Sequence, residues 1–113
     1  MKMNAMATKP DMPDVFVVLV TTPTDKEARL IGRKLIDSKL AACVNIISTH
    51  SFFYWENAFQ ETPESLLIIK AKKANLQKLE KRVKELHSYK NPEIIALPVA
   101  WGSKGYLDWV RKS

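Results

Sequence analysis

Strand-like sequence runs without interruption from Ala42 to Trp55, and this segment is too long for a small domain to enclose. Its fourteen residues would span about 45 Å at ~3.3 Å per residue. A compact domain of about 100 residues has a radius of gyration of only ~13 Å. The far end of the hairpin that contains this strand must therefore project beyond the core or bend sharply.

The far end of this hairpin is also the aromatic part of the chain. Half of the ten aromatic residues lie there, and successive strand residues place them on both faces: Phe52, Phe53, Tyr54, Trp55 and Phe59. A bent hairpin would fold over its own sheet, whereas a projecting one would pack against a neighbouring subunit. We favour the second interpretation, because a monomer would leave a large apolar patch in water and cyclic assembly would also cover sheet edges. These five aromatic residues are thus predicted to pack against a neighbouring subunit.

The segments around the long strand predict two helices and a first strand. A β-branched apolar run at 15–22 predicts a strand. Thr24 and Glu27 fit a capping box, in which Thr24 accepts a first-turn N–H and Glu27 reaches back, so a helix is predicted over 24–39. Apolar residues recur at 3-4-3 spacing after Asn75, which predicts an amphipathic second helix with Asn75 as its N-cap.

Proline and polar residues mark the ends of the other elements. A bulge or bend is predicted at 48–51, where the long strand becomes polar. Pro63 is predicted to open the next strand, over about 63–72. The last strand is predicted at 93–99, with Pro98 at a strand end or edge because proline lacks an N–H. A short C-terminal helix follows.

This order of elements predicts an α+β fold. It is a ferredoxin-like βαββαβ sandwich with an antiparallel four-stranded sheet, helices on one face, an extended central hairpin and a C-terminal helix. Residues 1–14 contain all four Met and lack apolar periodicity, so we predict a disordered tail there and a single domain over 15–113. No apolar run approaches the ~18–20 residues that cross a bilayer. A cytoplasmic location is expected, with an organelle left open.

The net charge of +6 at first suggests nucleic acid or an acidic membrane as a partner. Residues 70–90 hold eight Lys or Arg against two Glu, and most of them fall on the polar face of the second predicted helix. A solvated face explains that distribution. RNA-binding domains of this topology stack bases on aromatic residues in the third strand, but 63–70 contains no aromatic and no Gly. We therefore predict no nucleic-acid partner.

Two residue types could carry chemistry. Cys43 lies among small and apolar residues in a predicted strand, so a buried structural thiol is favoured over a nucleophile. His87 ends the second predicted helix, where the helix dipole alone would favour it. The functional alternative for His87 is a ligand pocket with Tyr89 and Glu93, although transition-metal sites usually have three or more N, S or O ligands.

Several blocks of sequence together resemble the CutA family of divalent-cation tolerance proteins. The resemblance covers roughly residues 15–112, in order and with similar spacing. The blocks are Lys39-Leu-Ala-Ala-Cys-Val-Asn-Ile46, Tyr54-Trp-Glu56, Leu67-Ile-Ile-Lys70, Pro92-Glu-Ile-Ile-Ala-Leu-Pro-Val99 and Tyr106-Leu-x-Trp109.

The resemblance implies a ferredoxin-like subunit in a tight homotrimer, similar in architecture to the PII signalling proteins. This agrees with the oversized hairpin and implies that its five aromatic residues form a trimer interface. It also implies a link to tolerance of copper and other divalent metals, and metal binding in some bacterial members. Animal members are instead associated with acetylcholinesterase membrane anchoring. The family pattern establishes no catalytic activity.

The copper-binding pattern of bacterial members is incomplete in this chain. That pattern has a Cys at the end of the first strand and two adjacent His after the second helix. Val20 and Leu86 stand at two of these positions, and His87 alone is retained. A weaker metal site with His87 and Glu93 is expected, in a subunit-interface cleft with Lys70, Tyr89 and Trp109.

We therefore expect a non-enzymatic homotrimer of divalent-metal (copper) tolerance or homeostasis that requires no cofactor. Its expected partners are its own copies and a weakly bound metal ion or small anionic ligand. The alternative is a PII-like signalling or scaffold module that binds a small anion or a protein partner through Lys70 and neighbouring bases. A hydrolase or phosphatase has little support, because no nucleophile–base pair stands out.

Overall fold

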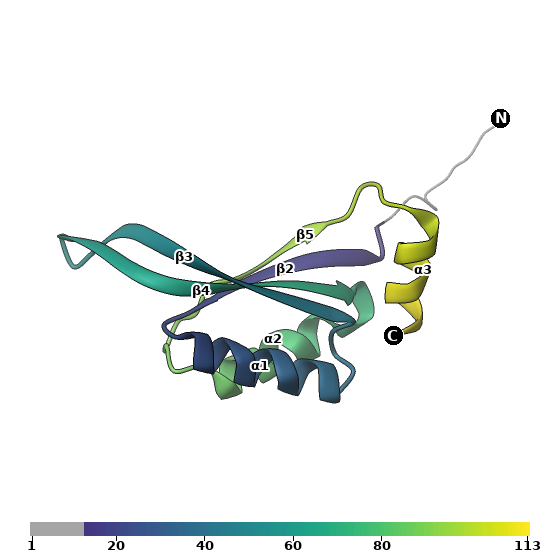
Figure 1. Cartoon of the computed structure of the whole chain (residues 1–113), viewed down its shortest axis with the longest axis horizontal. Helices are drawn as coiled ribbons and strands as arrows, with labels where there is room; N and C mark the ends of the chain where they lie inside the picture. Colours follow the sequence, from purple (N-terminus) through teal and green to yellow (C-terminus); the bar gives the residue numbers. More distant parts are fainter. Residues whose placement is uncertain (1–12) are drawn as a thin grey trace.

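The computed structural model describes residues 13–113, so nearly all of the tail predicted at 1–14 lies outside the described residues. A four-stranded antiparallel sheet of order β3-β4-β2-β5 carries α1 and α2 on one face, with α3 at one end (Figure 1). The predicted order of elements is confirmed. In chain order they are β2 (Val15–Thr22), α1 (Asp25–Asp37), β3 (Cys43–Trp55), β4 (Ala58–Lys72), the 3-10 turn η2 (Lys73–Asn75), α2 (Leu76–Leu86), β5 (Ile94–Pro98) and α3 (Lys104–Lys112).

The core lies between the sheet and the two long helices. Alternate residues of β2 and β4 face α1 and α2, as the period of two in a strand requires. Gly32 of α1 allows the helix to approach β3, since a Cβ at that position would lie 3.2 Å from Val44 Cγ1. The largest buried side chains of this core are Val18, Val20, Ile31, Leu35, Leu67, Ile69, Leu79 and Val83.

The β3–β4 hairpin projects beyond this core. We call residues 51–64 the arm, because β2 pairs with β4 only as far as Ser65. The molecule measures 56 × 33 × 23 Å, and its radius of gyration of 16.5 Å exceeds the ~13 Å of a compact domain of similar length. The predicted projection is confirmed, and the alternative of a hairpin folded over its own sheet is wrong for this chain. Glu56 and Asn57 turn the chain with φ of 50° and 65°, as in the primed turns that suit hairpins.

Two details of the predicted strands are wrong. β4 begins at Ala58 rather than at Pro63, because the hairpin pairing continues to the turn. Pro63 lies inside the strand opposite His50, at a point where β2 has already ended, so its missing N–H breaks no pairing with β2. The bulge or bend expected at 48–51 does not occur, since every residue from Cys43 to Trp55 faces one partner in an unbroken register.

The helix caps differ in part from the predictions. Thr24 caps α1 by accepting the Glu27 N–H at 3.1 Å, as predicted. The carboxylate of Glu27 does not return to the cap and instead accepts the Ser88 N–H at 2.9 Å. Asn75 precedes α2 without a side-chain cap, because the η2 turn already places its backbone in the helical region, and its amide donates to the Lys39 carbonyl instead. Pro98 ends β5 at the sheet edge, as expected.

Candidate functional site

His87 lies at the C-terminal end of α2, where its imidazole is completely buried. Nε2 lies 2.7 Å from the carbonyl oxygen of Thr21, which can only accept a hydrogen bond. Nδ1 accepts the backbone N–H of Tyr89 at 2.9 Å. These two partners place the single ring proton on Nε2. β5 pairs with β2 only up to Val20, so the Thr21 carbonyl lies just beyond that pairing and His87 satisfies it.

Glu27 approaches the same ring from α1. Its Oε2 lies 3.3 Å from His87 Nδ1 and also accepts the Ser88 N–H. The sequence prediction assigned Glu27 to the helix cap and missed this contact. The position of Glu27 in the first turn correctly indicated a hydrogen-bonding role. Its partner Ser88 lies 61 residues away in sequence, so a local pattern could not identify it.

Tyr89 extends the contacts of His87 toward the base of the arm. Its ring packs against the imidazole with centroids 4.9 Å apart, and its hydroxyl donates to Glu64 Oε2 at 2.7 Å. Ser51 Oγ donates to the other oxygen of Glu64 at 2.5 Å. Burial first, then the hydrogen bond to Glu64 and its charge, raise the pKa of Tyr89 to about 12. Glu64 is therefore held by two hydroxyl groups.

We call Glu27, Ser51, Glu64, His87 and Tyr89 the polar cluster. It joins α1, β3, β4 and the segment after α2, and Glu64 and Ser51 were missed at the sequence level. One signal was present: Glu64 has the same strand parity as Leu66 and Ile68, which suggests a partly buried acid. Within residues 13–113, neither carboxylate forms an ion pair with Lys or Arg. The cluster therefore carries unbalanced negative charge and suits a cation better than an anion.

The geometry of the polar cluster constrains metal binding. Both ring nitrogens of His87 already have hydrogen-bond partners, so a metal would first have to displace Tyr89 N–H or the Thr21 carbonyl. Glu93 is exposed, and no hydrogen bond or ion pair joins it to His87 in the described part of the chain. Over residues 13–113, no group of three or more His, Cys, Asp or Glu is placed to hold a metal ion.

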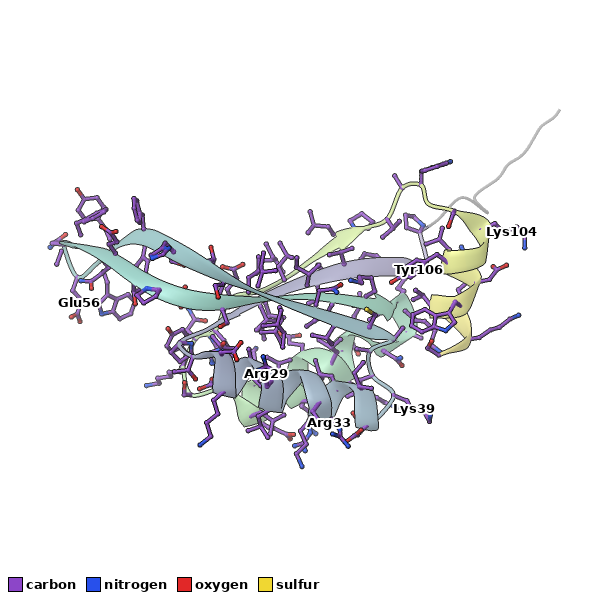
Figure 2. All side chains as sticks on the ribbon, viewed as in Figure 1. Arg29, Arg33, Lys39, Glu56, Lys104 and Tyr106 are labelled. Atoms are coloured by element: carbon purple, nitrogen blue, oxygen red, sulfur yellow. The ribbon has the colours of Figure 1, made fainter. Side chains whose placement is uncertain are left out.

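Lys70 and Trp109 lie at the other end of the sheet from the polar cluster. Lys70 donates to Asn45 Oδ1 and sits directly opposite Cys43 in the β3–β4 register. Burial and the nearby Cys43 thiol raise the pKa of Tyr106, whose ring packs on that of Trp109 with centroids 5.7 Å apart. Figure 2 shows Tyr106 on α3, far from Glu56 at the tip of the arm.

The predicted cleft of Lys70, Tyr89 and Trp109 is therefore divided within one chain. Tyr89 contacts Glu64, which lies six residues before Lys70 along β4, a distance of about 20 Å for a strand. The structure places Lys70 and Trp109 near one another through Cys43 and Tyr106, and it places Tyr89 with His87. A cleft that contains all three residues requires more than one copy of the chain.

The arm carries the five aromatic residues predicted for an interface, and all of them are exposed. Phe59 packs edge-on against Phe52 and Tyr54, with centroids 5.6 and 5.9 Å apart. Phe53 and Trp55 have the opposite strand parity, and Trp55 is 62% exposed. Both faces of the arm thus carry exposed aromatic residues, and exposed apolar surface of this kind marks an interaction site.

A family model described as CutA1 divalent ion tolerance protein matches residues 16–113. The chain belongs to this family. The divalent-cation tolerance protein CutA of Thermus thermophilus is 45% identical over 98 residues, which cover 86% of this chain and 95% of that protein. The chloroplastic protein CutA of Arabidopsis thaliana is 41% identical over 99 residues, and the match covers 87% of this chain but only 54% of that longer protein.

Solved structures of CutA proteins share the fold of this chain. The crystal structure of CutA1 from Oryza sativa has a TM-score of 0.85 at 39% identity and covers 90% of this chain and 94% of its own. The structure described as the periplasmic CutA protein from Archaeoglobus fulgidus has a TM-score of 0.84 at 37% identity, covering 87% and 96%. The predicted family resemblance is confirmed. Among residues 13–113, no helix is long and apolar enough to cross a membrane.

Proposed function

We propose that this CutA-family chain is a non-enzymatic, homotrimeric protein of copper tolerance that binds the metal weakly at the polar cluster. Membership of a divalent-cation tolerance family supports the metal role. The observation that carries the assignment to this site is the buried His87 beside Glu27, in a cluster whose carboxylates have no basic counter-ion in the described chain. Imidazole is a suitable ligand for copper.

Binding is expected to be weak because the free site is already satisfied. Copper must replace the Tyr89 N–H at Nδ1 or the Thr21 carbonyl at Nε2. Either replacement leaves a backbone group that must hydrogen-bond to water instead. Glu27 lies at the Nδ1 side of the ring, so its carboxylate supplies a second ligand. Glu93, which is exposed and does not contact His87 in the described chain, stays a ligand predicted from the sequence alone. The chain needs no resident cofactor in this account.

Calorimetric titration with Cu²⁺ tests the assignment. His87→Gln should lower the copper affinity at least about tenfold, while His50→Gln is the matched control because His50, the only other His, is exposed on β3. Thermal unfolding of both variants checks that each one is folded. Equal copper affinity in wild type and His87→Gln would contradict the site.

The homotrimer, with a ferredoxin-like subunit and a PII-like arrangement, is supported by two uncovered surfaces. One is the aromatic arm. The other is the sheet face away from α1 and α2, where Ile47, Ile95 and Leu97 are about half exposed. Val44 and Ile46 face α1 at Gly32, and Ile47 has the opposite strand parity, so it points to the other side of the sheet. Other copies of the chain would cover both surfaces.

A second candidate function is binding of a small anion or acidic partner at Lys70. It is favoured by the ammonium group of Lys70 beside the amide of Asn45, next to Cys43 and Tyr106, on a chain of net charge +6. Thermal-shift measurements with phosphate and citrate test it. Lys70→Gln should abolish any stabilisation, whereas Lys104→Gln, an exposed lysine on α3, should not.

We also propose that the protein is cytoplasmic and binds no nucleic acid. The relatives in rice and Arabidopsis are named as chloroplastic, and one structure from Archaeoglobus fulgidus is described as periplasmic. Fractionation of cells with an antibody against the chain decides between these compartments. A periplasmic or organellar signal would contradict the cytoplasmic proposal.

A further inference from the structure

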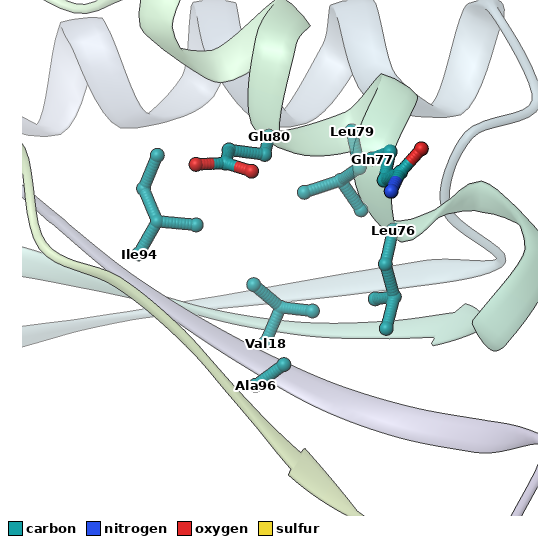
Figure 3. A pocket seen from close by; sticks show the side chains of 7 residues that line it. All are labelled: Val18, Leu76, Gln77, Leu79, Glu80, Ile94 and Ala96. Carbon is teal, nitrogen blue, oxygen red and sulfur yellow. The ribbon is translucent and has the colours of Figure 1, made fainter.

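An apolar cavity of about 190 Å³ lies between α2 and the edge strand β5. Leu79 of α2 lies on one side of it, and Val18, Ile94 and Ala96 of the neighbouring strands β2 and β5 lie on the other (Figure 3). Apolar cavities of ~150 Å³ in other proteins hold a benzene ring. The cavity is therefore large enough for one aromatic ring, and nothing in α2 or β5 fills it.

The rim of the cavity carries polar side chains, so an occupant of the cavity needs a polar group as well as an apolar ring. The side chains of Glu80 and Gln77 lie at its edge on α2 (Figure 3). One carboxylate oxygen of Glu80 bonds Lys84 at 3.0 Å, which leaves the other oxygen able to accept a hydrogen bond. An apolar ring with one N–H donor fits this combination better than a purely hydrocarbon ring. Indole has that chemistry, since its Nε1–H only donates.

The arm offers such a group with a complementary charge. Residues 51–64 carry three Glu and no Lys or Arg, a net charge of −3, which leaves +9 on the rest of a chain of net charge +6. Phe52, Tyr54 and Phe59 pack on one another, whereas Trp55 faces the other side of the hairpin and is 62% exposed. The arm of one copy is thus attracted to the body of another, with an indole at its end.

We propose that the cavity between α2 and β5 receives the indole of Trp55 from a second copy of the chain. The proposal rests on the homotrimer proposed above and names the contact that closes it. The contact is heterologous, arm on one copy and cavity on the next, so it can form a closed ring. A buried aromatic anchor in a pocket is also the kind of contact that dominates interface energetics.

Dissociation on dilution tests the role of Trp55. Trp55→Ala should raise the concentration of half-dissociation at least about tenfold. Trp101→Ala is the matched control, since Trp101 is 86% exposed but lies in the segment before the basic helix α3. Trp55→Phe should have an intermediate effect, because it keeps a ring and loses the N–H. Equal effects of Trp55→Ala and Trp101→Ala would overturn the proposal.

Cross-linking locates the contact independently of affinity. In a Cys43→Ser background, Ala58→Cys lies opposite Trp55 and Gln77→Cys lies at the cavity rim. A short bis-maleimide should join this pair between copies, giving covalent dimers and trimers. Ala58→Cys with Gly105→Cys is the control, since Gly105 has open space around it. If the protein is a trimer but Ala58→Cys and Gln77→Cys do not cross-link between copies, the cavity contact alone is overturned. A monomeric wild type would overturn the homotrimer as well.

Free indole distinguishes a subunit contact from a small-molecule pocket. Added as a probe, indole should raise the melting temperature of Trp55→Ala by more than that of the wild type, because Trp55 already occupies the cavity in the wild type. Equal stabilisation of both proteins would show that the cavity is free in the assembly, which would overturn the proposal.

Discussion

The two ends of the β3–β4 hairpin differ in what surrounds them. At the base, β4 lies between β2 and β3 and is covered by the helices, so Leu67 and Ile69 are completely buried. In the arm the same two strands have no third strand beside them, and the aromatic residues are exposed. One continuous register therefore serves two purposes. The base is stabilised by its own chain, whereas we propose that the arm is buried against another copy.

The largest expected effect tests the base. Leu67→Ala removes a fully buried side chain and should lower the free energy of unfolding by about 2–5 kcal/mol. Phe59→Ala in the arm should cost far less in the dissociated chain, because Phe59 is already exposed. Urea unfolding at low protein concentration measures both. Similar losses for the two variants would show that the arm is also part of the core.

The polar cluster connects the base to the arm and gives the next largest effect. Tyr89→Phe removes the hydrogen bond to Glu64 and should cost about 1.5–3 kcal/mol, as expected for a bond to a charged group. Ser113→Ala, which removes an exposed hydroxyl bonded to the Trp109 carbonyl, is a surface control with little expected cost. Chemical denaturation at neutral pH measures the difference, and an unchanged midpoint in Tyr89→Phe would show that Glu64 needs only Ser51.

The raised pKa of Tyr89 predicts a loss of stability at alkaline pH. The folded value of about 12 exceeds the ordinary 10.0, so the folded chain holds the phenol proton more tightly than the unfolded chain. Its contribution is complete below pH 10 and is lost as pH rises from 10 to 12. Urea midpoints should therefore fall more steeply in wild type than in Tyr89→Phe over that range. Parallel falls would contradict the raised pKa.

The smallest expected effect concerns the start of α1. Thr24→Ala removes the side chain that accepts the Glu27 N–H and should cost about 1 kcal/mol. Thr24→Ser keeps the acceptor and should cost a few tenths at most. If Glu27 also depends on this cap for its position beside His87, Thr24→Ala will weaken copper binding in the same titration. Unchanged copper affinity would show that α1 holds Glu27 without the cap.

Local patterns predicted the fold well because its elements are set by nearby residues. The 3-4-3 spacing after Asn75 and the capping residue Thr24 depend on interactions within a few positions of the chain. The length of β3 followed from a continuous pattern. The start of β4 was wrong because pairing across the turn, rather than the preference of Pro63, decides where that strand begins.

The candidate site was less predictable, since its contacts join distant segments. His87 and Tyr89 were identified from sequence, but Glu27 and Glu64 lie 61 and 25 residues from their respective partners Ser88 and Tyr89. A carboxylate in a helix cap or a strand looks like any surface acid until the topology places it against another element. Tyr89 and Lys70 were assigned to one cleft for the same reason, since a sequence pattern gives no distance along β4.

Sedimentation equilibrium of the wild-type chain at micromolar concentration tests the central claim that the arm requires other copies. The account predicts a mass three times the 12.9 kDa of the chain, because burial of the arm in neighbouring copies stabilises the assembly. A single species of 12.9 kDa, with the arm exposed and the chain stably folded, would contradict it.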